Sequence, residues 1–146
     1  MKFTYFFLSV LALGLTFTSC NKDDDDDDHG HSDFEYHAHI NSPNSDNKHL
    51  GDTIDIQVNF EDHNGGTVHH INVRILNKDT EEVIYSKPDV AHVHDESGAY
   101  LFEDKFVLSM DNGVSAHTDW ILEAKVWGHE AGEGEEISTI EFHVHP

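Results

Sequence analysis

Apolar and polar residues alternate with a period of two along most of this chain, and no stretch sustains the 3.6-residue period of an amphipathic helix. The segments FEYHAHI, from Phe34 to Ile40, and IDIQVNF, from Ile54 to Phe60, place an apolar residue at every second position. Successive side chains of a strand point to opposite faces, so this pattern is typical of strands with one buried face. The chain is therefore expected to be all-β.

Seven segments carry the strand pattern, namely residues 34–40, 54–60, 69–77, 82–86, 100–108, 120–126 and 137–144. Turn-forming residues separate them, including Ser42-Pro43-Asn44, Asn64-Gly65-Gly66 and Asp111-Asn112-Gly113. Seven short strands in roughly 110 residues predict a seven-stranded immunoglobulin-like β-sandwich over residues 34–146.

Two parts of the predicted sandwich resemble known families. The segment WILEAKVWGHEAG and the later EFHV are similar to the last two strands of bacterial immunoglobulin-like and fibronectin-like modules, with His129 at the Asp and Gly132 at the Gly of their D-x-x-G closure. His37-Ala38 followed by Ser42-Pro43 resembles the periplasmic copper-resistance protein C family, whose sandwich begins with a His-Ala dipeptide. That family binds copper through a free amino terminus, which here would be Cys20, so copper is only weakly implied.

The first 20 residues have the layout of an export signal. Lys2 precedes an apolar run from Phe3 to Phe17, which ends in small residues and Cys20. The run is shorter than the roughly 20 apolar residues that cross a bilayer, and acidic residues follow it. Residues 1–19 are therefore expected to be a removable signal peptide.

The residues around Cys20 resemble those of a bacterial lipoprotein. Phe17-Thr18-Ser19-Cys20 resembles a lipobox, with Phe17 where Leu is commonest, and Asn21-Lys22-Asp23-Asp24 resembles the signal for the outer face of the Bacteroidota outer membrane. The resemblance implies that Cys20 carries acyl chains, palmitate among them. These would anchor the protein in the outer membrane, facing the cell surface.

Acidic residues dominate the composition. Residues 20–33 contain six consecutive aspartates and are expected to form a disordered tether. The net charge of −21 becomes −22 when Lys2 is removed with the signal peptide. This charge argues against nucleic acid as a partner and against any membrane contact except the lipid anchor. Cations are the natural ligands, although acidity can also serve solubility alone.

Histidine is unusually frequent, with fourteen residues in the chain. They include four His-x-His pairs: His29/His31, His37/His39, His92/His94 and His143/His145. Residues i and i+2 of a strand share a face, so two imidazoles can converge on one ion at about 2.0–2.1 Å. Further ligands must come from other segments. His29 and His31, in the tether, are expected to form no defined site.

The predicted topology gathers several histidines at one end of the sandwich. The loops after the second and sixth predicted strands and the loop before the fifth meet there, and Asp95 and Glu96 lie in them. Their candidate metal ligands are His63, His69, His70, His92, His94, His129 and Glu130. A second, weaker metal cluster is expected where the first and last strands run side by side, from His37, His39, His143 and His145. His117 is expected to be a turn residue.

The available ligands restrict the metal. Cys20 is the only cysteine, and lipidation consumes its thiol. Imidazole with carboxylate suits Zn(II), Cu(II) or Ni(II), and no D-x-D-x-D-G loop for calcium follows the tether. We expect zinc, with copper as the alternative.

Two functions follow from these observations. Export signal, histidine content and sandwich together resemble a family of histidine-rich Bacteroidota surface lipoproteins of uncharacterised function. The first function is capture of a divalent transition metal ion by the histidines at one end. The alternative is an adhesive or scaffold module that binds protein or glycan through a pH-sensitive histidine surface. The chain has no H-E-x-x-H, no G-x-S-x-G and no cysteine nucleophile, so no enzymatic activity is expected.

Overall fold

A computed structural model describes residues 34–146 of the chain. The expected signal peptide, Cys20 and the tether lie outside the described residues. The described chain forms nine strands and one short 3₁₀ turn: β1 (Tyr36–Ser42), β2 (Lys48–His49), β3 (Thr53–Asp62), β4 (Val68–Asn77), β5 (Val83–Lys87), β6 (His92–Asp95), β7 (Ala99–Val107), η1 (Met110–Asn112), β8 (Thr118–Trp127) and β9 (Glu136–His145). The all-β prediction is confirmed. Within residues 34–146, no helix has the length and hydrophobicity needed to cross a membrane.

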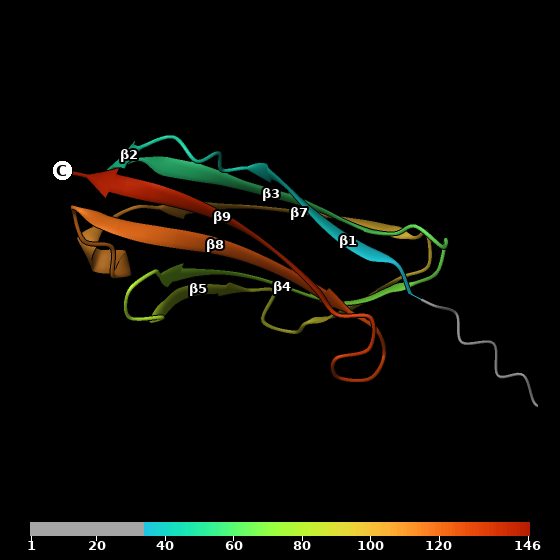
Figure 1. Cartoon of the computed structure of the whole chain (residues 1–146). Helices are drawn as coiled ribbons and strands as arrows, with labels where there is room; N and C mark the ends of the chain where they lie inside the picture. The colour runs from blue at the N-terminus through green and yellow to red at the C-terminus, as the bar shows by residue number, and fades with distance from the viewer. Residues whose placement is uncertain (1–33) are drawn as a thin grey trace, which may run out of the picture. The chain divides into compact units, whose positions relative to one another are not determined.

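The strands form two sheets that pack face to face (Figure 1). The smaller sheet has the order β1-β3-β7, and the larger has the order β2-β9-β8-β4-β5, with β6 paired to β4. The strand pairs are antiparallel, except that β2 runs parallel to β9. The arrangement is an immunoglobulin-like sandwich, as predicted.

The core lies between the sheets and follows from the alternation in the sequence. Ile56, Val58 and Phe60 of β3 are at most 1% exposed, and they face the larger sheet, where Ile71 and Leu122 are fully buried. Burying one such side chain contributes about 1.5–3 kcal/mol. The packed core therefore accounts for the stability of this region without a disulfide.

Two buried aromatic side chains of the core, Tyr85 and Trp120, donate hydrogen bonds. Tyr85 Oη donates to Asp104 Oδ2 at 2.8 Å, which joins the two sheets, and Trp120 Nε1 donates to Thr118 Oγ1 at 2.7 Å. Burial and the hydrogen bond to Asp104 raise the pKa of the Tyr85 phenol, which therefore keeps its donor proton at neutral pH.

Two short strands, β2 and β6, form where the sequence was expected to form loops. β2 pairs through Lys48 with Val144 and through His49 with His145. β6 pairs through His92 with His70. Segments this short show no clear period, and their partner strands determine their position. Both carry histidines, so they bear directly on the candidate sites.

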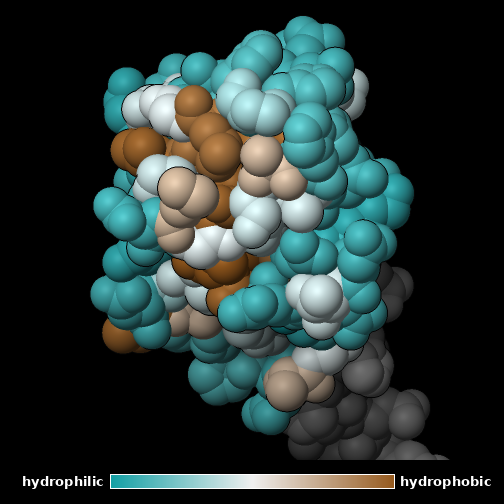
Figure 2. Space-filling view, turned by 90° about the vertical axis from the view of Figure 1, so that its left-hand side faces the viewer, coloured by the Kyte–Doolittle hydropathy of each residue, from teal (hydrophilic) through white to brown (hydrophobic). Residues whose placement is uncertain are grey.

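The histidines lie toward the two ends of the sandwich. The β3–β4 turn and the β8–β9 loop lie at one end, and β2, η1 and the carboxyl terminus lie at the other (Figure 1). Figure 2 looks onto the carboxyl-terminal end, where apolar residues gather in the middle and hydrophilic residues surround them.

Candidate metal-binding histidine groups

The described histidines all lie beside other histidines. Of the fourteen, His29 and His31 lie outside the described residues, and each of the other twelve has another histidine ring centroid within 6.5 Å of its own. They form three groups. The loop cluster comprises His69, His70, His92, His94 and His129; the β1 group comprises His37, His39 and His63 with Glu35 and Glu61; the C-terminal group comprises His49, His117, His143 and His145.

Three elements build the loop cluster. His69 and His70 begin β4, His92 and His94 lie on β6, and His129 follows β8. The ring centroids of His69 and His94 are 5.1 Å apart, those of His69 and His129 are 5.6 Å apart, and those of His70 and His92 are 4.8 Å apart. Five imidazoles from sequence-distant segments therefore share one small region.

An irregularity in the backbone shapes this cluster. Val68 pairs with Asp95 and His70 with His92, so β6 has one residue more than β4 between these pairs. The extra residue makes a bulge, a feature that redirects side chains. His94 takes a left-handed conformation with φ of 51°. The alternation of β4 is also interrupted, since His69 and His70 are both half-buried between buried Val68 and Ile71.

Hydrogen bonds fix the orientation of His70. Its Nδ1 lies 2.7 Å from the carbonyl oxygen of Gly128 and must donate to it, so Nε2 carries the lone pair of the neutral ring. That Nε2 accepts a hydrogen bond from His92 Nδ1 at 3.1 Å. The Trp127 ring stacks on His70 with centroids 5.3 Å apart. His70 is thus held with its lone pair facing a second imidazole nitrogen.

The environment favours the neutral form of the cluster. Burial, with the neighbouring histidines His94, His129, His70 and His92, lowers the pKa of His69. Partial burial and three neighbouring histidines also lower the pKa of His92. Neutral imidazole is the form that ligates metals. In addition, His69 Nδ1 is buried without a hydrogen-bond partner among the described residues.

The geometry of the His70–His92 pair is close to that of two metal ligands. Two nitrogens that each lie about 2.0–2.1 Å from a tetrahedral ion are about 3.3 Å apart. The observed distance between His70 Nε2 and His92 Nδ1 is 3.1 Å. No three ligand atoms of the loop cluster lie mutually within 4.8 Å, so a third ligand requires rotation of His69, His94 or His129.

The β1 group combines imidazoles with carboxylates. The rings of His37 and His63 have centroids 4.1 Å apart. One ligand atom from each of Glu35, His37 and His63 lies within 4.8 Å of the others, and the same holds for His39, Glu61 and His63. His37 Nε2 is buried without a hydrogen bond, and its Nδ1 lies 3.5 Å from Glu136 Oε1. These residues could hold a metal ion.

The C-terminal group contains a triad made only of histidines. One ligand atom from each of His117, His143 and His145 lies within 4.8 Å of the others. His49 joins them through His145, with ring centroids 5.7 Å apart. Neither His49 nor His117 was predicted to be a ligand. The pairing of β8 with β9, in which Thr118 lies opposite Val144, brings His117 beside His143 and His145.

The structure brings together five of the seven residues predicted at the first site. His63 lies in the β1 group instead, because its backbone N–H donates to the carbonyl of Glu35 at 3.0 Å and places it beside the start of β1. Glu130 is exposed in the β8–β9 turn, where its backbone N–H donates to Glu133 Oε2 at 3.1 Å. Neither residue belongs to the loop cluster.

The second predicted cluster is divided between two groups. His37 and His39 lie with His63, whereas His143 and His145 lie with His117. The first and last strands are neighbours, but His37 meets Glu136 at the start of β9. His143 lies seven residues further along, roughly 23 Å away at about 3.3 Å per residue. These four histidines therefore do not share one site, because the start of β1 lies beside the start of β9 and not beside its end.

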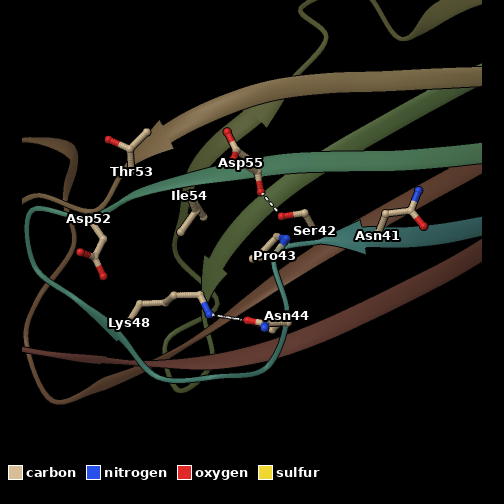
Figure 3. Close-up of a pocket in the computed structure, with 9 residues that line it drawn as sticks. All are labelled: Asn41, Ser42, Pro43, Asn44, Lys48, Asp52, Thr53, Ile54 and Asp55. Atoms are coloured by element: carbon tan, nitrogen blue, oxygen red, sulfur yellow. Dashed lines mark hydrogen bonds between the residues drawn. The ribbon is translucent and has the colours of Figure 1, made fainter.

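A pocket of about 360 Å³ lies between the β1–β2 loop and the start of β3 (Figure 3). It is lined by residues 41–44, Lys48 and residues 52–55. Lys48 Nζ donates to Asn44 Oδ1 at 2.7 Å, and Ser42 Oγ donates to the Asp55 carbonyl at 2.7 Å. No histidine lines this pocket, so it is not one of the candidate metal sites.

Comparisons with known proteins bear on the fold. The sequence matches no family model and none of the curated proteins. The solution structure of the CARDB domain of the PF1109 protein from Pyrococcus furiosus is similar over 76% of this chain and 94% of that chain, with a TM-score of 0.50 and 11% identity. The crystal structure of that domain in complex with di-metal ions has a TM-score of 0.48 and 12% identity, over 77% of this chain and 96% of that one. The first likeness supports the immunoglobulin-like fold and nothing further.

Proposed function

We propose that this protein binds a divalent transition metal ion, zinc or alternatively copper, at the loop cluster. One observation carries the proposal. The Nε2 lone pair of His70 faces His92 Nδ1 at 3.1 Å, while the Gly128 carbonyl holds the opposite ring nitrogen of His70. A metal-bound imidazole usually donates its second N–H to such an acceptor, which fixes the tautomer of the ligand. The contact with Gly128 therefore supports His70 as a metal ligand.

The remaining ligands come from the same cluster. His69 Nδ1 is buried and unpartnered, and His94 and His129 lie beside it with ring centroids 5.1 Å and 5.6 Å away. Rotation of any one of these rings supplies a third nitrogen. A site built from imidazoles suits Zn(II), Cu(II) or Ni(II), and the lowered pKa values of His69 and His92 keep both rings ready to bind at neutral pH.

The backbone supports a functional interpretation of the cluster. In the described chain, the non-glycine residues with positive φ are Glu81, His94 and His117. A left-handed conformation costs a non-glycine residue about 1 kcal/mol or more, and such strain tends to persist at binding sites. Two of these three residues lie in histidine groups, which is consistent with selection for ligand position.

We further propose that the site works at the cell surface. The export signal and lipobox-like residues in the sequence imply a lipid anchor at Cys20, and the acidic tether would hold the sandwich away from the outer membrane. The net charge, −21 for the whole sequence and −22 without Lys2, attracts cations and raises their concentration near the protein. In this proposal the protein captures or buffers metal and catalyses no reaction.

Calorimetric titration of Zn(II) into residues 21–146 at pH 7.5 tests the proposal. This chain contains all of the described residues, 34–146, and leaves out Cys20. We expect binding with a micromolar or lower Kd that the double variant His92→Ala/His94→Ala weakens strongly. The matched control is His37→Ala/His63→Ala, which removes two histidines from the β1 group. Binding weaker than millimolar, or equal loss in both variants, would contradict the loop cluster as the metal site.

The contacts between histidines and carboxylates in the β1 group favour a second candidate function, a pH-sensitive adhesive or scaffold surface. His63 Nε2 lies 3.3 Å from Glu61 Oε2, and His37 Nδ1 lies 3.5 Å from Glu136 Oε1. Protonation of these imidazoles would convert a negative surface to a locally neutral one and change what it binds. Capture of a protein or glycan partner at pH 5.5 but not at pH 7.5, in the presence of chelator, would support this function. Loss of capture in His37→Ala/His63→Ala would assign it to the β1 group.

A further inference from the structure

The C-terminal group lies on neighbouring strands at the end of the sandwich opposite the β8–β9 loop. His143 and His145 are on β9, and the His117 backbone N–H donates to the Val144 carbonyl between them at 2.7 Å. The ring centroids of His143 and His145 are 4.7 Å apart, and those of His117 and His145 are 6.3 Å apart. Unlike the loop cluster, this triad already has one ligand atom from each residue within 4.8 Å of the others.

A carboxylate orients one of the three rings. His143 pairs with Asp119 across the β8–β9 ladder, and His143 Nδ1 lies 2.7 Å from Asp119 Oδ1. Nδ1 therefore carries the proton and Nε2 keeps its lone pair. Carboxylate–imidazole pairs of this kind stand behind metal ligands, where they set the tautomer and raise the basicity of the ring.

His49 is available as a fourth ligand. It pairs with His145 through the parallel β2–β9 ladder, and the two ring centroids are 5.7 Å apart. Its side chain is exposed, so it can rotate toward the triad. A strand of only two residues thus adds a fourth imidazole to the group. Three or four nitrogen ligands would complete or nearly complete a tetrahedral site.

Two further observations fit a ligand site. His117 has a φ of 58°, a left-handed conformation that is unfavourable for a residue with a side chain. Partial burial and the neighbouring His143, His49 and His117 lower the pKa of His145. The nearby cation Lys78, whose backbone N–H donates to the Asp119 carbonyl at 3.0 Å, directs its amine to Glu141 Oε2 at 2.6 Å.

We propose that the C-terminal group is a second metal site, in which His117, His143 and His145, with His49 as the fourth ligand, bind Zn(II) or Cu(II). It is independent of the loop cluster. His129 follows β8 and precedes β9, whereas His143 and His145 lie in the last three residues of β9, so most of the length of β9 separates the two sites, roughly 20 Å or more at about 3.3 Å per residue. One sandwich would then carry one ion at each end.

Zinc titration of ¹⁵N-labelled residues 21–146, followed through the imidazole nitrogens by NMR, tests the second site. We expect the ring nitrogens of His117, His143 and His145 to shift and saturate, both in the unaltered chain and in His92→Ala/His94→Ala. Failure of the loop cluster alone would leave these shifts intact, so the two proposals can fail separately. If these three rings do not respond to about 1 mM zinc, the second site is refuted.

A stoichiometry measurement completes the test. We expect His117→Ala/His145→Ala to lose one equivalent of bound zinc in native mass spectrometry while the loop-cluster resonances still respond. Asp119→Asn should weaken the second site by about 10- to 100-fold and leave the first unchanged, as expected for a positioning residue. An unchanged stoichiometry in the double variant would overturn the proposal. If that variant does not fold, the titration of the unaltered chain and the Asp119→Asn variant still decide it.

Discussion

The loop cluster and the β1 group use the same side chain in different surroundings. In the loop cluster, five imidazoles face one another, and His70 and His92 form a direct nitrogen-to-nitrogen contact of 3.1 Å; one carboxylate joins them, with Glu96 Oε1 3.4 Å from His94 Nε2. In the β1 group, imidazoles also pack on one another, with the His37 and His63 ring centroids 4.1 Å apart, but they face several carboxylates as well, as where His63 Nε2 lies 3.3 Å from Glu61 Oε2. Like-charged rings resist protonation together, whereas a carboxylate stabilises an imidazolium beside it.

This difference separates two uses of histidine. A cluster of mutually repelling imidazoles presents neutral nitrogen donors at neutral pH, which is the requirement for zinc or copper. An imidazole–carboxylate surface offers mixed nitrogen and oxygen ligands and can also respond to protons. A high histidine content therefore does not define one function for the whole surface, because the neighbours of each ring decide its chemistry.

Removal of His70 should have the largest effect. Its ring is the one whose Nδ1 is held by the Gly128 carbonyl, so we expect His70→Ala to weaken zinc binding at the loop cluster by about 100-fold or more. Loss of an outer-shell partner alone costs about 10- to 100-fold. His63→Ala in the β1 group should change the same Kd by less than about threefold. Competition with a chromophoric chelator measures the zinc Kd of both variants. Equal effects of His70→Ala and His63→Ala would contradict a specific role of the loop cluster in zinc binding.

Acidification should weaken zinc binding at the loop cluster by an amount similar to that expected for His70→Ala. Metal binding requires neutral rings, so lowering the pH from 7.5 to 5.5 should reduce zinc affinity by up to about 100-fold for two ligating imidazoles with pKa values near 6.5. The lowered pKa values of His69 and His92 should make the loss smaller than for unperturbed imidazoles. Calorimetric titration at a series of pH values measures how steeply the zinc affinity depends on pH. Affinity that does not depend on pH would argue against imidazole ligands.

The metal-free protein should become less stable as the pH falls through 6.5. The unfolded chain takes up protons at His69, His92 and His145 near pH 6.5, whereas the folded chain takes them up only at lower pH because their pKa values are lowered. The contribution of these neutral histidines to the free energy of unfolding is therefore fully present above pH 6.5 and decreases as the pH falls below it. Thermal unfolding in chelator should show a lower Tm at pH 5.5 than at pH 7.5. His92→Ala should reduce this difference, and a Tm that rises on acidification would contradict the assigned directions.

Substitution of His94 by glycine should have the smallest effect on stability. Glycine accepts the φ of 51° without strain but loses more backbone entropy on folding, so His94→Gly should leave the metal-free protein about 1 kcal/mol more stable than His92→Gly does, even if it weakens zinc binding. His92→Gly is the matched control, because His92 lies on the same strand and is not among the residues with positive φ. Urea unfolding in chelator compares them. Equal destabilisation in the two variants would mean that the conformation of His94 carries no strain.

The sequence predicted the fold and most of the loop cluster. The alternation of apolar and polar residues indicates which side chains face the core. The topology of the predicted seven-stranded sandwich brings His69, His92 and His129 to one end. The sequence could not place His63, because its position depends on a backbone hydrogen bond to Glu35. His49 was missed because β2 is too short to show a period. His117 was missed because register across the sheet, rather than its own neighbours in sequence, places it beside His143 and His145.

Anomalous diffraction from a crystal of residues 21–146 grown with one equivalent of zinc tests the central claim most directly. The account predicts a zinc peak between His70 and His92, about 2.0–2.1 Å from His70 Nε2 and His92 Nδ1, with a third nitrogen from His69, His94 or His129. The Gly128 carbonyl should remain bonded to His70 Nδ1. Zinc at the β1 group, with His70 Nε2 still hydrogen-bonded to His92, would contradict it.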